Sequence, residues 1–148
     1  MKKLFIVLAI ALLIMSFAMN TSPYQNEPLS IEGTWELVSH YNYDGETIAD
    51  TVYPTDGYRQ IKMYYNGKVM WTRYVPTDSV EWFGYGSYSI TDTSLTEQLE
   101  YMSSSMRKVA NPDMIWTMRL QLEKNRYSQI FTDADGIPVN SENYRRLD

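Results

Sequence analysis

One short segment of the sequence places a carboxylate among apolar side chains. Alternate residues of an extended strand point to the same side, so Glu97 shares a face with Leu95, Leu99 and Tyr101. If that face is the protein interior, the carboxylate needs a hydrogen-bond donor, because an unpaired buried charge is costly. Arg73, Arg146 or a tyrosine could donate. Glu97 is therefore the candidate for a polar ligand anchor; the alternatives are a structural ion pair and a position at the barrel mouth in water.

Other reactive side chains are scarce. His40 is the only histidine and the chain has no cysteine, which argues against zinc ligation and Cys–His catalysis. The sequence "DADG" at 133–136 lacks the distal glutamate of a calcium loop, so it indicates a turn. We therefore expect no metal and no cofactor, and these patterns assign no catalytic residue.

Runs of alternating apolar and polar residues recur along the chain, separated by turn residues. Asn66-Gly67 lies between two such runs and is a strong hairpin signal, because both residues tolerate positive φ. Ser103–Ala110 is the one segment that could form a short helix. The predicted strands are Thr34–Tyr41, Tyr58–Tyr65, Lys68–Val75, Trp82–Thr91, Leu95–Tyr101, Ile115–Leu122, Arg126–Thr132 and Asn143–Leu147.

Short hairpins between successive strands favour an antiparallel meander. A meander of this length removes its unpaired edges when it closes on itself. The predicted fold is all-β, an antiparallel up-and-down barrel of about eight strands, whose interior holds side chains or one small ligand.

The first residues have the pattern of an export signal. Lys2 and Lys3 precede an apolar run, and Ser16-Phe17-Ala18 supplies small residues at a cleavage site. We expect residues 1–18 to be a signal peptide, 19–30 a flexible tether and 31–148 one barrel domain. An uncleaved anchor is the alternative, although the apolar run is short for a bilayer span of ~20 residues. The protein is then exported, to the periplasm or the extracellular space, without stable membrane insertion after cleavage.

The composition narrows the classes of partner. The formal net charge is −5 at pH 7 and becomes more negative once the two signal lysines are removed. Nucleic acid and anionic membranes repel such a chain, so we expect neither as a partner. Without cysteine, the exported domain must be held together by packing rather than by disulfides.

Three segments resemble those of a known family. "GTWELVS" at 33–39 is similar to the Gly-x-Trp opening strand of the lipocalin (calycin) group. "YGSYSITDTSLTEQLEY" at 85–101 and "ENYRRL" at 142–147 resemble exported lipocalin-like domains of unassigned function from Bacteroidetes-type bacteria. In lipocalins the first-strand Trp closes one end of the barrel and an Arg of the last strand packs across it. The resemblance therefore implies barrel closure by Trp35 with Arg146 or Arg145, beside Tyr144.

The leading function is binding of one small apolar or amphiphilic molecule in the barrel, without catalysis. The expected lining is mainly aromatic: Tyr65, Trp71, Trp82, Tyr88, Glu97, Trp116, Met118 and Tyr127. One alternative is a calycin-shaped enzyme that uses Glu97 with Tyr88 or Tyr101 as acid or base. Another is an interaction scaffold, with a filled barrel and loops such as Val75–Glu81 that meet another protein.

Overall fold

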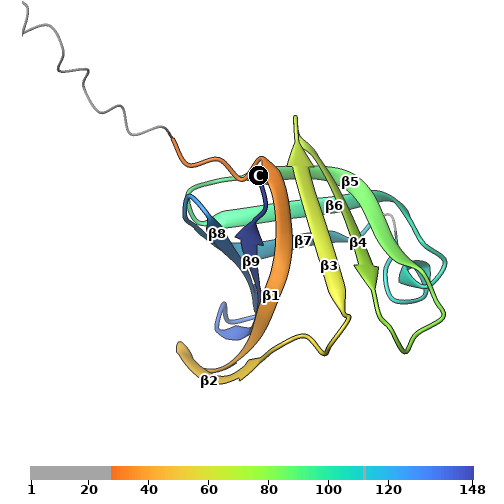
Figure 1. The fold of residues 1–148 in the computed structure, drawn as a ribbon. Coiled ribbons are helices and arrows are strands. Elements are labelled where there is room, and N and C mark those ends of the chain that lie inside the picture. The colour runs from red at the N-terminus through yellow and green to blue at the C-terminus, as the bar shows by residue number, and fades with distance from the viewer. Residues whose placement is uncertain (1–27, 112) are drawn as a thin grey trace, which may run out of the picture.

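The computed structural model describes residues 28–111 and 113–148, which are almost entirely antiparallel β-sheet (Figure 1). The expected signal peptide, and the expected tether up to residue 27, lie outside the described residues. The strands are β1 (Gly33–Asp44), β2 (Thr47–Val52), β3 (Arg59–Tyr65), β4 (Lys68–Tyr74), β5 (Trp82–Ile90), β6 (Ser94–Met102), β7 (Ile115–Leu122), β8 (Arg126–Thr132) and β9 (Pro138–Arg146).

The sheet closes into a ring through its first and last strands. Each strand from β3 to β9 pairs with its neighbour in the chain, β1 pairs with β3 through 33–36, and β1 also pairs with β9 through 35–42. β2 lies outside this ring, because it pairs only with the far half of β1 at 40–44. The expected all-β antiparallel fold with ring-like closure is confirmed.

Turn chemistry sets the register at the clearest hairpin. Asn66 and Gly67 both have positive φ, 48° and 73°, between β3 and β4. Asparagine and glycine adopt this region with little strain, and the resulting turn matches the twist of the two strands. The β3–β4 hairpin that "NG" predicts is therefore present.

The structure departs from the predicted elements most clearly in three places. No strand was predicted over β2, because nearly all of its residues are exposed and it has no buried face to create alternation. The last strand begins at Pro138 rather than at Asn143, with polar residues in its first half. In place of a helix over Ser103–Ala110 there is one 3-10 turn, η1 (Met106–Lys108), since the segment is too short to propagate an α-helix.

The end of the barrel where β1 begins is sealed. Trp35 is fully buried, and its indole nitrogen donates to the carbonyl of Ile31 at 2.7 Å. The guanidinium carbon of Arg146 lies 4.0 Å from the centre of the Trp35 ring. Arg146 also donates to the carbonyls of Ser30 and Glu32 at 2.7 and 2.6 Å, so it ties the entering chain to the last strand.

Between Arg145 and Arg146, the structure places only Arg146 at this seal. Arg145 points to the outside of the barrel and donates to Glu36 at 2.7 Å. Below the seal, Tyr127 meets Trp35 edge to face at 4.8 Å and stacks on Tyr144 at 4.7 Å. This half of the interior is filled by side chains.

Candidate functional site

The opposite half of the barrel contains a cavity of about 350 Å³. Its lining includes Arg73 near the end of β4, Trp82 at the start of β5, and Met106 and Val109 in the segment between β6 and β7. Val109 is 65% exposed although it lines the cavity, so it marks the rim. The cavity therefore opens at the end remote from Trp35.

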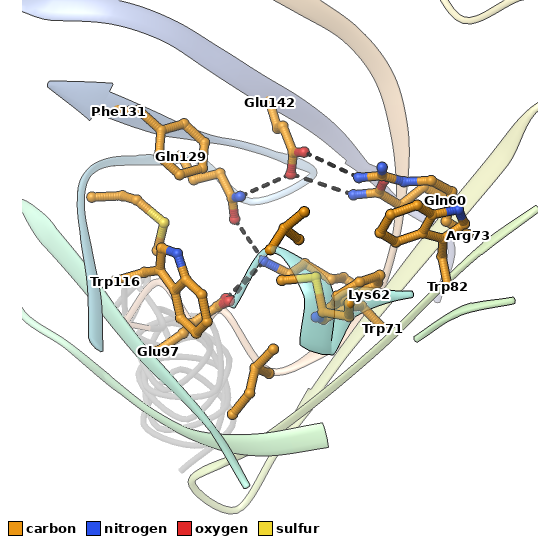
Figure 2. A pocket seen from close by; sticks show the side chains of 14 residues that line it. Gln60, Lys62, Trp71, Arg73, Trp82, Glu97, Trp116, Gln129, Phe131 and Glu142 are labelled. Atoms are coloured by element: carbon orange, nitrogen blue, oxygen red, sulfur yellow. Dashed lines mark hydrogen bonds and ion pairs between the residues drawn. The ribbon is translucent and has the colours of Figure 1, made fainter. Parts of the chain in front are cut away.

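Three tryptophans form much of the wall: Trp71 on β4, Trp82 on β5 and Trp116 on β7 (Figure 2). The absence of a side chain at Gly84 makes room for one of them, since a Cβ there would lie 2.6 Å from the indole nitrogen of Trp71. The indole nitrogen of Trp82 donates to Asp78 at 3.1 Å. Apolar residues complete the wall: Leu99, Met106, Val109, Met118 and Phe131.

An ion pair forms part of the cavity floor. Lys62 on β3 donates to both carboxylate oxygens of Glu97 on β6, at 2.8 and 3.0 Å, and to the amide oxygen of Gln129 at 2.8 Å. The hydroxyl of Tyr64 donates to Glu97 at 2.5 Å. The Lys62 and Glu97 side chains are only 4% and 7% exposed. All three donors of the ammonium are thus engaged within the protein.

A second carboxylate, Glu142 on β9, continues this network. Its Oε2 accepts from Tyr144 at 2.6 Å, from Gln129 at 2.8 Å and from Gln60 at 3.3 Å. Gln129 therefore links the two carboxylates, because its oxygen accepts from Lys62 and its nitrogen donates to Glu142. Figure 2 shows this chain of contacts crossing the cavity floor.

Arg73 occupies the side of the cavity next to Glu142. Its Nε donates to the amide oxygen of Gln60 at 2.8 Å, and its Nη2 lies 3.9 Å from Oε1 of Glu142. The guanidinium carbon is 5.9 Å from the ring centre of Trp71 and 5.8 Å from that of Trp82. The cation therefore lies over both rings, which attract it electrostatically.

Burial keeps the tyrosines of this network neutral. Desolvation is the main cause that raises the pKa of Tyr64 and of Tyr144 well above the ordinary tyrosine value; the carboxylate of Glu97 raises the pKa of Tyr64 further, and that of Glu142 raises the pKa of Tyr144 further. A neutral phenol can donate a hydrogen bond, whereas a phenolate cannot. Both hydroxyls are thus held as donors to the two carboxylates.

The cavity brings together some of the expected ligand-binding residues and not others. Those that line it are Trp71, Trp82, Glu97, Trp116 and Met118. Tyr127 lies in the filled half, and Tyr88 is half-buried beside Tyr64, with ring centres 4.9 Å apart. Tyr65 is 76% exposed on the outside of the barrel, so its expected place in the lining is corrected.

Lining residues that sequence reasoning missed are mostly polar: Gln60, Lys62, Arg73, Gln129 and Glu142, together with Leu99, Met106, Val109 and Phe131. On β3 the face with Gln60, Lys62 and Tyr64 is buried, whereas Met63 and Tyr65 are exposed. Apolar alternation selects the opposite face, which explains both the Tyr65 error and the omission of Lys62. The donors to Glu97 are Tyr64 and Lys62. The two arginines expected as donors lie elsewhere, since Arg73 donates to Gln60 and Arg146 donates to backbone carbonyls at the sealed end.

Among the residues that the structure describes, the hydrogen-bond partners of Glu97 are Lys62 and Tyr64, and neither Tyr88 nor Tyr101 pairs with it. Tyr101 was expected on the face of Glu97, but it is exposed, because a bulge opposite Tyr85 and Gly86 shifts the register of β6.

Within residues 28–111 and 113–148, no cluster of three or more His, Asp or Glu is placed to hold a metal. No helix in the described ranges is long and apolar enough to cross a membrane.

Two solved structures are similar to this chain. A lipocalin-like protein from Bacteroides uniformis matches with a TM-score of 0.53 at 13% identity, over 78% of this chain and 97% of that one. An uncharacterized protein from Bacteroides eggerthii matches with a TM-score of 0.51 at 16% identity, over 80% and 100%. No protein-family model matches the sequence, and no curated protein does so significantly. The fold is therefore lipocalin-like, as the opening and closing strands suggest.

Proposed function

We propose that this lipocalin-like protein is a binding module that holds one small amphiphilic molecule in the open half of its barrel. The observation that supports the proposal is the cavity of about 350 Å³, with tryptophan walls and a charged floor. Small-ligand pockets usually measure ~300–1,000 Å³ and combine a mostly apolar lining with a few placed polar groups. The ligand's apolar part would lie against the tryptophans and its polar end against the floor.

The contacts of Glu97 favour binding over catalysis. Its carboxylate is already engaged by Lys62 and Tyr64, and neither Tyr88 nor Tyr101 is among its hydrogen-bond partners. A general acid or base must reach the substrate proton, directly or through one water. The interaction-scaffold alternative requires a filled barrel, whereas this barrel has a cavity in one half.

We also propose that the protein binds its ligand after export, in the periplasm or outside the cell. The lysines, the apolar run and the small residues within 1–18 support this. N-terminal sequencing of the protein from the cell envelope and the medium tests it. A mature chain that begins near Met19 is expected, and an intact Met1 in the membrane fraction would contradict export with cleavage.

Fluorescence titration with N-phenyl-1-naphthylamine tests the binding function. This dye is neutral and mostly apolar, and its emission rises when it leaves water. Because Trp71, Trp82 and Trp116 line the cavity, we expect saturable energy transfer from tryptophan to the dye with one site per chain. Trp116→Ala should weaken binding by about tenfold, because burial of a large aromatic contact is worth more than ~1.4 kcal/mol.

Tyr65→Ala is the matched control, since it removes an exposed aromatic side chain outside the barrel. It should leave the dissociation constant unchanged. Dye that binds without saturation, or that is lost equally from both variants, would remove the support for a cavity ligand. Thermal melting of each variant shows that the barrel remains folded during the titration.

A further inference from the structure

The polar groups around the cavity divide into engaged and available ones. The ammonium of Lys62 has three partners within the protein, and the amides of Gln60 and Gln129 each use both their oxygen and their nitrogen. In the described part of the chain, no residue donates a hydrogen bond to Oε1 of Glu142, and none accepts one from Nη1 or Nη2 of Arg73. The available groups are therefore one acceptor atom, Oε1 of Glu142, and two donor atoms, Nη1 and Nη2 of Arg73.

These available groups lie side by side. Nη2 of Arg73 and Oε1 of Glu142 form an ion pair at 3.9 Å, and this distance is too long for a direct hydrogen bond. Their side chains are 30% and 16% exposed, so both reach the cavity surface. Figure 2 shows Arg73 beside Gln60 and Trp82, with dashed lines from the Glu142 carboxylate to Arg73 and Gln60. A group that accepts from the arginine and donates to the glutamate would complete both sets of bonds.

The charge around the cavity is balanced. Its charged lining residues are Lys62, Arg73, Glu97 and Glu142, two of each sign. A ligand with one net charge would bring in a charge with no counter-charge of its own, and withdrawing an unpaired charge from water is costly. A carboxylate near Arg73 also meets Glu142, and an ammonium near Glu142 also meets Arg73. Arg73 already covers the faces of Trp71 and Trp82, so a second cation there would be repelled.

We infer that the ligand's polar end is an uncharged group that both donates and accepts hydrogen bonds, such as a carboxamide, and that it lies between Arg73 and Glu142. The inference rests on the proposed function, because it names the chemistry of the ligand held in the same cavity. It replaces Glu97 as the anchor, since Glu97 is already engaged by Lys62 and Tyr64. The ligand's apolar body would lie against the parts of the cavity wall that Arg73 leaves uncovered, such as Trp116.

Three probes with one ring system test this inference by calorimetry on the purified protein at neutral pH. They are 1-naphthaleneacetamide, 1-naphthaleneacetate and 2-(1-naphthyl)ethylammonium, and 1-methylnaphthalene reports on the ring alone. The acetamide should bind at least about tenfold more tightly than the anion or the cation, because like charges placed together in an interface are strongly unfavourable. It should also bind more tightly than 1-methylnaphthalene, which has no polar end.

Two substitutions should change the order of the probes in opposite directions. Glu142→Gln removes a negative charge with little change of shape, so the acetate should gain affinity relative to the acetamide. Arg73→Gln removes a positive charge, so the ethylammonium should gain instead. Glu100→Gln and Arg145→Gln make the same chemical changes outside the barrel, where Glu100 pairs with Lys68 and Arg145 with Glu36, and should leave the order unchanged.

The outcomes separate this inference from the proposed function. An acetate or ethylammonium that binds the parent protein as tightly as the acetamide would overturn the inference, while the cavity would remain a binding site. Equal affinity for all three probes and for 1-methylnaphthalene would also overturn the inference and leave the cavity as a binding site. Failure of every probe, including N-phenyl-1-naphthylamine, would overturn both. If either Glu142→Gln or Arg73→Gln does not fold, the other variant still shows whether the order of the probe affinities depends on the charge that it removes.

Discussion

Lys62 and Glu97 form an ion pair that is almost completely withdrawn from water. Taking two such charges out of water costs several kcal/mol each, and their attraction offsets this only with good geometry and further hydrogen bonds. Both conditions are met, because Lys62 also donates to Gln129 and Glu97 also accepts from Tyr64. The pair adds little net stability as a unit, but each partner depends strongly on the other.

Glu97→Gln should therefore destabilise the protein by about 3–5 kcal/mol, because it leaves the Lys62 ammonium buried without a counter-charge. Urea denaturation followed by tryptophan fluorescence measures the change. The double variant Lys62→Met/Glu97→Leu removes both charges and should recover much of the lost free energy of unfolding. Such recovery would identify the unpaired charge, rather than lost packing, as the cause.

An exposed carboxylate provides the matched control. Glu100→Gln breaks the contact with Lys68 on the outside of the barrel, where solvent screens the pair, so the urea midpoint should stay close to that of the parent. Equal unfolding midpoints for Glu97→Gln, Glu100→Gln and the parent would contradict the role of the buried pair. The buried ammonium of Lys62 would then not depend on the negative charge of Glu97.

At the level of strands, β5 and β6 approach each other unusually closely where the register shifts. The shift pairs Tyr85 with Tyr101 and Gly86 with Leu99, which leaves Glu100 without an opposite residue. A Cβ at Gly86 would overlap the carbonyl oxygen of Gln98. Gly86 is therefore needed for the close approach of two backbones, not for a turn, and the bulge depends on it.

Gly86→Ala should cost about 1–3 kcal/mol, because the backbone of β6 must shift to relieve the overlap. Ser87→Ala, on the next residue of the same strand, is the control and should stay within about 0.5 kcal/mol. Thermal or urea unfolding of both variants measures the difference. An alanine at Gly86 that is tolerated as well as the one at Ser87 would show that the strands can separate at no cost.

How much the sequence can predict differs from strand to strand. On β7, regular alternation puts Trp116 and Met118 on the inner face, and the structure has them there. On β6, the same rule holds for Glu97 and fails for Tyr101, because a bulge adds one residue that no local pattern announces. On β3, alternation selects the wrong face, since the interior next to this strand is a polar network contributed by distant strands.

Those distant strands explain why the candidate site was only partly predictable. The aromatic and apolar wall follows from composition and strand parity, as Trp71 and Trp82 illustrate. The polar floor does not, because Lys62 is acceptable inside only once Glu97 and Gln129 are placed against it. A long-range network of this kind becomes visible only when the ring of strands is closed.

The whole barrel has two unlike halves separated by this network. One half is sealed by Trp35 and Arg146 and filled with aromatic rings, and the other contains the open cavity. Packing in the sealed half holds the floor in place, while the rim of the other half, where Val109 is exposed, is open. Under the proposed function, stability and binding would depend on opposite ends of the barrel, and the buried tyrosines lie between them.

These tyrosines should make the stability of the barrel fall at high pH. Tyr64, Tyr127 and Tyr144 are buried, and desolvation raises the pKa of each well above the unfolded value of 10.0. Above about pH 10 the unfolded chain loses these protons while the folded chain keeps them, so unfolding is favoured. The stabilising contribution is thus complete below pH 10 and falls as the pH rises towards the folded pKa values.

Each tyrosine should contribute a slope of about 1.4 kcal/mol per pH unit in that range. Urea unfolding at about pH 9 and about pH 11 measures the loss, while ultraviolet absorbance of tyrosinate shows that the buried rings ionise only on unfolding. Tyr127→Phe removes one titrating group, whose hydroxyl has that of Tyr64, at 3.3 Å, as its one hydrogen-bond partner among the described residues, and should make the slope shallower. A free energy of unfolding that stays constant up to about pH 11 would contradict the burial of these phenols, because ionisable groups with equal pKa values in both states produce no pH dependence.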